Sequence, residues 1–132
     1  MYKTKEISLK TSEQNQMIDI TSMVRDFVKE SHVRDGMCFI YVPHTTASIV
    51  INENTDPQLR DDILDHIERL IPKGEKYKHS SHAAAHIKAS LLGNSKTLLI
   101  KDNKLLLGRW EALYFCEFSG PRERVVIVRV QV

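Results

Sequence analysis

The sequence predicts an α+β domain, with an antiparallel, β-sandwich-like arrangement of strands and two or three helices. Short apolar runs of β-type residues recur at hairpin spacing over the last third of the chain. Two or three segments with helical periodicity lie before and between such runs in the first two thirds. No helical pattern separates the C-terminal runs, and this disfavours a doubly wound parallel sheet because parallel strands need crossover connections.

We expect one domain over residues 1–132, because this length can bury a core without disulfides or metal. No repeat and no Pro/Gly/Ser-rich tract divides the chain. The net charge of +2 is too near neutrality to predict a nucleic-acid or membrane partner. Cys38 and Cys116 each lie in an apolar run, which favours reduced core thiols in a cytoplasmic protein.

The first half of the chain predicts strands on both sides of one amphipathic helix. Residues 2–10 alternate loosely, as in an outer strand. A short strand then leads into a helix for which Thr21 is the expected N-cap. Two β-type runs follow at residues 37–42 and 49–51.

The clearest helix begins after Asp56, which can cap it, while Pro57 suits its first position. Apolar residues then recur on one face as far as residues 70–71. A third helix is expected over residues 82–92, ended by Gly93. The remaining β-type runs are residues 97–101, 105–107, 113–118 and 125–132.

Three of the six histidines fall within eight positions, at His79, His82 and His86. The spacing of His82 and His86 puts both imidazoles on one face of a helix, with His79 near the helix start. A set of two or three histidines with an open position is what a catalytic divalent ion needs. Since no H-E-x-x-H motif accompanies them, exposed polar residues or a satisfied core histidine remain the alternative.

His44 stands at the end of a predicted buried strand and is followed by three hydroxyl residues, Thr45, Thr46 and Ser48. Such a cluster can bind an anion or position a water, with His44 as proton donor or metal ligand. The alternative is a strand end whose hydroxyl groups satisfy nearby backbone groups.

Asn52, Glu53 and Asn54 join the next strand to the helix that Asp56 caps. Together they can bind an amide, a hydroxyl or a metal-bound water, although they are equally suited to a turn and cap. Trp110 is the single tryptophan, and packing is the common role of such a residue.

Arg122 and Arg124 lie one position apart at the start of the last strand. Alternate residues share one face of a strand, so the two guanidinium groups can together bind one phosphate or pyrophosphate. The alternative is a pair of solvent-facing ion pairs with Glu123 and Glu117, which stabilise little.

Several common catalytic motifs are absent. The sequence contains no G-x-x-x-x-G-K-[ST], G-x-G-x-x-G, G-x-S-x-G or C-x-x-C pattern. Their absence disfavours nucleotide-loop, dinucleotide, serine-hydrolase and dithiol-redox functions.

The remaining motifs have a characteristic order. They are His44-Thr45-Thr46-Ala47-Ser48, Asn52-Glu53-Asn54 with Asp56-Pro57, Tyr77-x-His79, Ala85-His86-Ile87-Lys88-Ala89-Ser90, Leu107-Gly108-x-Trp110 and Gly120-Pro121-Arg122. Over essentially the whole chain they resemble the YjbQ-type family, also called the secondary thiamine-phosphate synthase family. The resemblance implies an α+β domain around an antiparallel β-sandwich, usually a homotrimer with sites near the subunit contacts. It also implies the joining of hydroxymethylpyrimidine diphosphate to thiazole phosphate with release of pyrophosphate.

The resemblance also assigns residues. The family's histidines correspond to His44, His79 and His86, its acidic-amide loop to residues 52–54, and its C-terminal arginine to Arg122. This chain departs from the family at three positions, which bear on its substrate specificity. Arg109 and Glu111 flank the tryptophan where relatives commonly have Thr and Gln, and His82 adds a possible extra metal ligand.

Three functions follow as hypotheses. In the first, a transferase, Arg122, Arg124 and the hydroxyl groups hold the phosphates of small substrates. A divalent ion (zinc or magnesium) or His44 then stabilises the departing pyrophosphate, while Trp110 stacks on the pyrimidine. The second is a metal-dependent hydrolase or lyase of a small phosphorylated metabolite, with a three-histidine site. The third is a non-catalytic trimeric binding protein.

Overall fold

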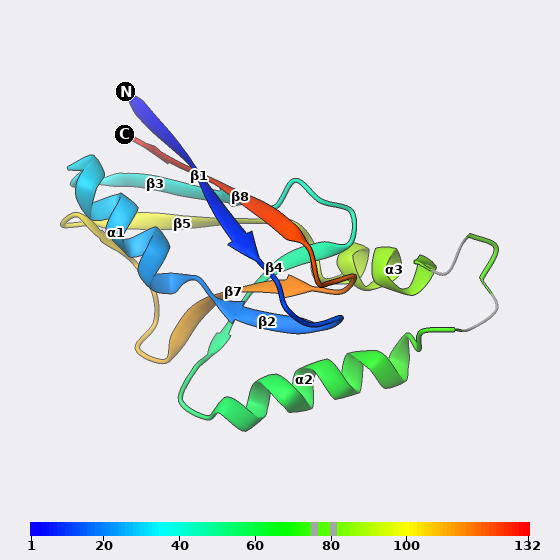
Figure 1. Cartoon of the computed structure of the whole chain (residues 1–132). Helices are drawn as coiled ribbons and strands as arrows, with labels where there is room; N and C mark the ends of the chain where they lie inside the picture. The colour runs from blue at the N-terminus through cyan, green and yellow to red at the C-terminus, as the bar shows by residue number, and fades with distance from the viewer. Residues whose placement is uncertain (75–76, 80–81) are drawn as a thin grey trace.

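The computed structural model describes residues 1–74, 77–79 and 82–132 (Figure 1). Its elements are, in chain order, β1 (Tyr2–Lys10), β2 (Gln16–Asp19), α1 (Thr21–Ser31), β3 (Gly36–Tyr41), β4 (Ala47–Glu53), α2 (Pro57–Leu70), α3 (Ala83–Leu92), β5 (Ser95–Lys101), β6 (Lys104–Leu105), β7 (Glu111–Glu117) and β8 (Glu123–Gln131). This combination confirms the predicted α+β class. Within the described ranges, no helix has the length and apolar character needed to cross a membrane.

The strands form two antiparallel sheets. One has the order β1-β8-β3-β5-β6 and the other the order β2-β7-β4. β1 and β8 pair along their whole length, from Tyr2 opposite Gln131 to Lys10 opposite Glu123. These pairings confirm the antiparallel sheets that the sequence predicts.

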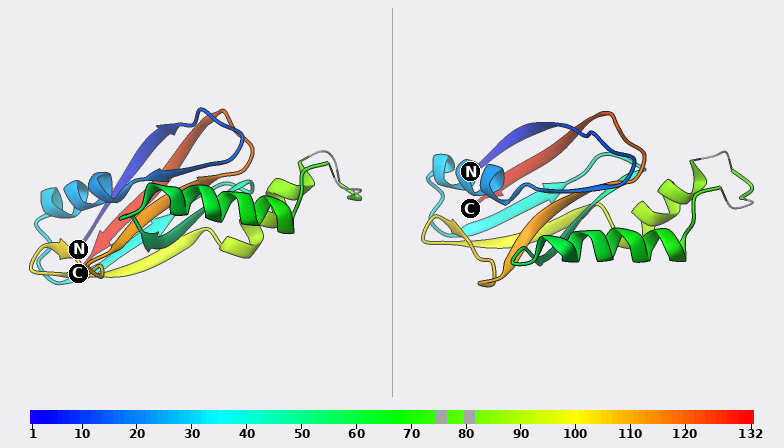
Figure 2. Two further views of the ribbon diagram at one scale, coloured as in Figure 1. Left: turned by 90° about the horizontal axis from the view of Figure 1, so that it is seen from below. Right: turned by 60° about the horizontal axis from the view of Figure 1, so that its bottom comes forward.

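The core has two parts, one on each face of the smaller sheet. Val126 and Val128 of β8 pack with Ile49 of β4 and Phe115 of β7 between the two sheets, and α1 contributes Phe27 to the same cluster. The other face of the smaller sheet packs against α2 and α3. The residues of that second cluster include Ile63, Leu64, Ala85, Ala89, Ala112, Tyr114 and Cys116. Figure 2 shows α2 and α3 together on one side of the molecule, apart from α1.

The cap of α2 is as predicted, whereas the cap of α1 is not. The Asp56 carboxylate accepts a hydrogen bond from Gln58 N at 2.9 Å, and Pro57 is the first helical residue. Thr21 was expected to cap α1, but it is the first residue inside the helix. Asp19 Oδ1 accepts from Thr21 N, and Leu113 N of β7 donates to the Thr21 hydroxyl. The prediction was wrong because a strand distant in sequence uses the hydroxyl group.

The observed strand bounds differ from the predicted ones where pairing with a neighbouring strand lengthens or shortens the strand. β4 and β7 pair from Ala47 opposite Glu117 to Glu53 opposite Glu111, so both extend beyond their apolar centres. The predicted strand 105–107 is shorter, because β6 pairs with β5 only at Lys104 and Leu105.

Both cysteines are free and buried, as the sequence predicts. Burial raises the pKa of the Cys38 thiol to about 12 and has the same effect on Cys116. The two thiols are therefore protonated side chains of the core at neutral pH.

Three connections pass from one sheet to the other at the same end of the sandwich. They are residues 11–15, 42–46 and 118–122, and we call this the crossover end. The opposite end of β4 and β7, with residues 52–54 and 108–111, we call the far end. The two ends are about 20 Å apart, because a strand advances about 3.3 Å per residue along β4.

Candidate functional site

A polar groove opens at the crossover end. It consists of two adjoining hollows of about 550 and 430 Å³, which share His44, Thr45 and Asn94. The other polar side chains on its walls include His82, His86, Ser119, Arg122 and Arg124. We call it the His44 groove. The topology creates it, because the crossover connections carry His44 and Arg122 to the same end of the sandwich.

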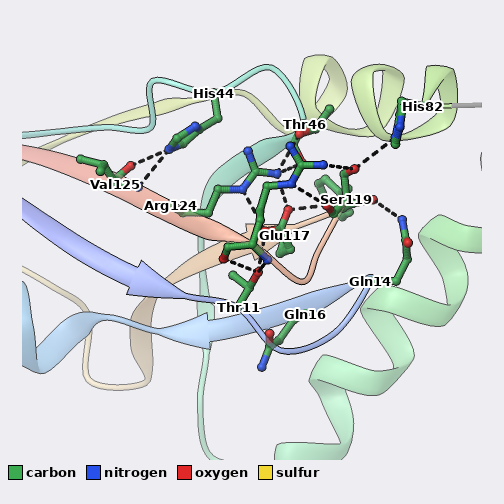
Figure 3. A network of polar contacts seen from close by, with 12 residues as sticks. Thr11, Gln14, Gln16, His44, Thr46, His82, Glu117, Ser119, Arg124 and Val125 are labelled. Atoms are coloured by element: carbon green, nitrogen blue, oxygen red, sulfur yellow. Dashed lines mark hydrogen bonds and ion pairs between the residues drawn. The ribbon is translucent and has the colours of Figure 1, made fainter. Parts of the chain in front are cut away.

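Arg124 lines this groove and forms a buried ion pair with Glu117 (Figure 3). The Arg124 guanidinium donates two hydrogen bonds to the Glu117 carboxylate, and the two side chains are only 4% and 0% exposed. Arg124 also donates to the Thr46 hydroxyl at 2.7 Å. Burial favours a raised Glu117 pKa, but hydrogen bonds from Arg124, Ser119 N and Thr11 outweigh it and lower that pKa. Glu117 is therefore ionised at neutral pH.

One sequence-based alternative is corrected here. Arg124 does pair with Glu117, but the pair is buried rather than solvent-facing. Arg124 points to the inner side of β8, where the neighbouring inward residues Val126 and Val128 are in the core. Charges in such a place need a close partner, because they have lost their water.

Arg122 is different, because it lies just before β8 and is exposed. Its Nε donates to Ser119 O at 2.8 Å and its Nη2 to Ser119 Oγ at 3.0 Å. Within the described chain no carboxylate lies at ion-pair distance from Arg122. Among the described residues, the groove therefore contains one guanidinium that is held in place by neutral oxygens and has no carboxylate partner.

His44 is anchored through one ring nitrogen. Its Nε2 lies 3.0 Å from both the N–H and the carbonyl oxygen of Val125, so the tautomer decides which of them it bonds. Burial and the charge of Arg124 lower the pKa of His44, and the Val125 hydrogen bond only partly offsets them. The ring is therefore neutral at pH 7, and Nδ1 remains as the nitrogen for a ligand.

The three predicted hydroxyl residues have separate environments. Thr45 is exposed on the wall of the groove. Thr46 is buried and bonded to Arg124. Ser48 is fully buried on β4, opposite Cys116 of β7, and does not line the groove. Of these three residues, Thr45 alone therefore offers an accessible hydroxyl to a ligand.

The predicted metal ligands are only partly assembled in one chain. The rings of His79 and His86 touch edge to face, with centroids 5.4 Å apart, and His86 lines the smaller hollow. His82 Nδ1 lies 3.2 Å from the Ser119 hydroxyl. Among the described residues, no group of three or more His, Cys, Asp or Glu side chains is close enough to hold a metal ion. The contact of His79 with His86 is that of an edge-to-face aromatic pair, and metal binding by these two residues stays a prediction.

The remaining predicted site residues form a second group at the far end. Asn52, Glu53 and Asn54 are exposed at the end of β4. Asn54 N donates to Trp110 O at 3.3 Å, and Trp110 is 54% exposed. The Arg109 guanidinium lies 4.7 Å from the Trp110 ring centroid. The structure thus divides the predicted site residues into two groups at opposite ends of the sandwich.

Sequence reasoning missed two members of the groove network. Ser119 connects Arg122 with His82, and Thr11 donates to Glu117 at 2.8 Å from the first crossover connection. One signal was available, because Glu117 is a lone carboxylate inside the apolar run 112–118. A buried carboxylate requires a charged or hydrogen-bonding partner.

Comparison with known proteins gives consistent matches along nearly the whole chain. The family model described as UPF0047 protein YjbQ-like matches residues 5–132. A UPF0047 protein of Methanocaldococcus jannaschii is 46% identical over 92% of this chain and 89% of its own. The UPF0047 protein YugU of Bacillus subtilis is 40% identical over 96% of this chain and 97% of its own.

Solved structures agree with the fold. An uncharacterized conserved protein of the YjbQ/UPF0047 family from Clostridium acetobutylicum is 50% identical, with a TM-score of 0.94 over 96% of this chain and 99% of its own. A protein of unknown function from Sulfolobus solfataricus, described as YbjQ-like, is 33% identical with a TM-score of 0.95, over 98% of this chain and 96% of its own. The chain therefore belongs to the YjbQ/UPF0047 family.

Proposed function

We propose that the His44 groove binds the phosphate or diphosphate group of a small metabolite. The observation that carries this proposal is the contrast between its two arginines. Arg124 is neutralised by Glu117, whereas Arg122 has neutral partners only among the described residues. A positioned guanidinium without a carboxylate suits an anionic ligand, which it can bind through two parallel hydrogen bonds. Thr45 and His44 Nδ1 supply further polar contacts on the same walls.

The reaction that we propose is the transfer implied by the sequence motifs, a thiamine-phosphate synthase-like reaction. The diphosphate of hydroxymethylpyrimidine leaves as the thiazole nitrogen attacks, and negative charge grows on the leaving group. Arg122 stabilises that charge in the groove, and Thr45 orients the phosphate oxygens. A divalent ion, zinc or magnesium, held by His79 and His86 would supply further positive charge there. The lowered pKa of His44 favours such a cation over a protonated imidazole as the second source of charge.

A direct assay tests this function. The purified chain is incubated with both thiamine precursors, with and without added Mg²⁺ or Zn²⁺, and thiamine phosphate is measured. We expect turnover in the wild type and a loss of about 10²- to 10³-fold in Arg122→Gln. Arg34→Gln is the matched control, since Arg34 is exposed and pairs with Asp102 away from the groove. Wild-type turnover no faster than in the protein-free control would refute the transferase.

We further propose a homotrimer in which the far end of one copy meets the His44 groove of the next. Two facts support it: the far-end residues lie about 20 Å from the groove in one chain, and Trp110 is 54% exposed. In such an assembly Trp110 can stack on the pyrimidine, with Asn52, Glu53 and Asn54 beside it. Mixing Arg122→Gln and Trp110→Ala chains tests this directly, because part of the activity returns only when one site uses two chains. Light scattering gives the oligomer mass, and a monomer would refute this assembly.

A second candidate is a metal-dependent hydrolase or lyase of a small phosphorylated metabolite, favoured by the contact between His79 and His86. Zinc that stays bound at one ion per chain after dialysis, and is lost in His86→Ala, would support it. Phosphate binding without turnover of any substrate would instead indicate a non-catalytic trimeric binding protein. In each case we propose a cytoplasmic protein without nucleic-acid or membrane partners, given its net charge of +2 and its two free thiols.

A further inference from the structure

A second, smaller polar cavity lies between α2 and α3. Its volume is about 90 Å³, the liquid volume of about three water molecules. Its lining includes Gln14, Glu68, Lys73, His82, Lys88 and Phe118. His82 belongs also to the wall of the His44 groove, so the two spaces are neighbours. We call this space the Lys88 cavity.

Lys88 is the most unusual feature of this cavity, because its side chain is only 3% exposed. Its ammonium group donates to Glu68 Oε1 at 2.6 Å and lies 5.8 Å from the Phe118 ring centroid. An ammonium carries three N–H donors. Within the described residues Glu68 is its hydrogen-bond acceptor, so two donors are left for an acceptor inside the cavity.

The charges around the cavity favour an anion. Lys88 and Lys73 contribute two ammonium groups, and the Lys73 ammonium lies 3.4 Å from Gln14 Oε1. Glu68 contributes one carboxylate. Burial favours a raised Glu68 pKa, but the hydrogen bonds from Lys88 and from Lys73 N lower it, so Glu68 is ionised at neutral pH. Among the described residues that line the cavity, one positive charge therefore remains without a counter-charge.

The Glu68 carboxylate oxygens also accept hydrogen bonds from other residues. Oε1 accepts from Lys88 and, at 3.3 Å, from Asn15 Nδ2, while Oε2 accepts from Lys73 N at 2.8 Å. These contacts spread the carboxylate charge over donors of the protein. An anion that enters the cavity consequently meets N–H donors rather than a bare carboxylate.

The start of α3 adds neutral donors to the same wall. Ala84 and Ala85 line the cavity and belong to the first turn of α3, and among the described residues their backbone N–H groups have no hydrogen-bond acceptor. His82 provides no side-chain cap, and the first turn contains no acidic residue. These amides are added to the buried ammonium and increase the preference for negative charge.

We propose that the Lys88 cavity is a second anion site, which binds one phosphate group through Lys88, Lys73 and the first turn of α3. The volume admits a phosphate group but not a nucleotide or a whole aromatic metabolite. The phosphate is either free inorganic phosphate or the end of a phosphate monoester whose remainder extends past His82 into the groove. The binding does not depend on the reaction that takes place in the groove.

The test follows the backbone amides of Ala84 and Ala85 by NMR in the ¹⁵N-labelled full chain during titration with inorganic phosphate. Chloride at equal ionic strength is the control. We expect saturable shifts of both amides in the wild type, and the same shifts in Arg122→Gln, because Arg122 lies outside the cavity lining. A failure of phosphate binding in the groove is thereby separated from a failure in the cavity.

The variants are chosen so that the fold survives. Lys88→Met alone leaves Glu68 uncompensated, so it is combined with Glu68→Gln, and we expect phosphate affinity in the cavity to fall at least about tenfold. Lys73→Gln removes an exposed ammonium, and about a threefold loss is expected. Lys101→Gln, an exposed lysine of β5, is the matched control with unchanged affinity.

A parallel titration with glycerol phosphate distinguishes the two sources of the ligand. Shifts of Ala84 and Ala85 with inorganic phosphate alone identify a free-phosphate site. Shifts with both ligands identify a site for the phosphate end of a monoester. The proposal is overturned if neither ligand produces saturable shifts at tens of millimolar, or if the Glu68→Gln/Lys88→Met double variant binds as tightly as the wild type.

Discussion

The two ends of the β-sandwich carry similar side chains in opposite surroundings. At the crossover end, Glu117 and Arg124 are almost fully buried and bonded to each other. At the far end, Glu53 is exposed, and among the described residues its carboxylate accepts one long hydrogen bond, from the Thr55 hydroxyl at 3.4 Å. A buried charge must be held by fixed partners, whereas an exposed one is stabilised by water. The comparison predicts a rigid, pre-formed site at one end and an adaptable surface at the other.

The largest effect is expected from Arg124→Met. It leaves the Glu117 carboxylate buried without its main partner, so the free energy of unfolding should fall by about 3–5 kcal/mol. Urea denaturation of both proteins measures the change. If both residues are replaced, as in Glu117→Leu/Arg124→Met, much of the loss should be recovered. A single variant as stable as the wild type would contradict the picture of a rigid crossover end.

A medium effect is expected next to the far end, at the start of α2. Asp56→Ala removes the side chain that accepts from Gln58 N, and a lost N-cap lowers the free energy of unfolding by about 1 kcal/mol. Asp62→Ala, on the exposed face of α2, is the control and should change it by less than about 0.5 kcal/mol. Equal losses in the two variants would show that the cap is not what stabilises this end.

A smaller effect concerns pH and the crossover end. The pKa of His44 lies below its ordinary value of 6.5, so the unfolded chain takes up this proton more readily than the folded one. The stability due to neutral His44 is complete above pH 6.5 and is lost as the pH falls toward the lowered pKa. The stability due to the ionised Glu117 carboxylate is lost only below pH 4.5, because the pKa of Glu117 lies below its ordinary value of 4.5.

The two pH steps can be separated by mutation. His44→Gln should remove the upper step. Between pH 6.5 and the lowered pKa of His44, the free energy of unfolding of this variant, relative to its own value at pH 7, should fall less than that of the wild type. Urea denaturation at a series of pH values measures the difference. An unchanged profile in this range would mean that His44 does not titrate differently in the folded state.

The smallest effect is expected from Glu53→Gln at the far end. The exposed carboxylate makes no ion pair among the described residues, and its removal should change the free energy of unfolding by less than about 0.5 kcal/mol. Glu117→Gln, the same substitution at the crossover end, should be several times more costly. Similar losses in both variants would remove the distinction between the two ends.

Local signals predicted more of this molecule than distant ones did. The Asp56 cap followed from neighbouring residues, and the strand patterns led to the antiparallel sheets. Thr21 was misassigned because Leu113, far along the chain, uses its hydroxyl. The motifs singled out His44 and Arg122, which do share a groove. Their separation from residues 52–54 depends on the length of β4 and its register with β7, and the motifs contain neither.

The full-length pairing of β1 with β8 has a consequence for how the chain reaches its native state. β1 pairs with β8, which lies far along the chain and is synthesised much later. Hydrogen bonds between such remote segments cannot form until synthesis of both is complete, and closing a loop of that size is slow. We therefore expect nascent chains that lack β8 to leave both edges of β1 unpaired, where the finished sheet leaves one, and to need a chaperone until β8 has been synthesised.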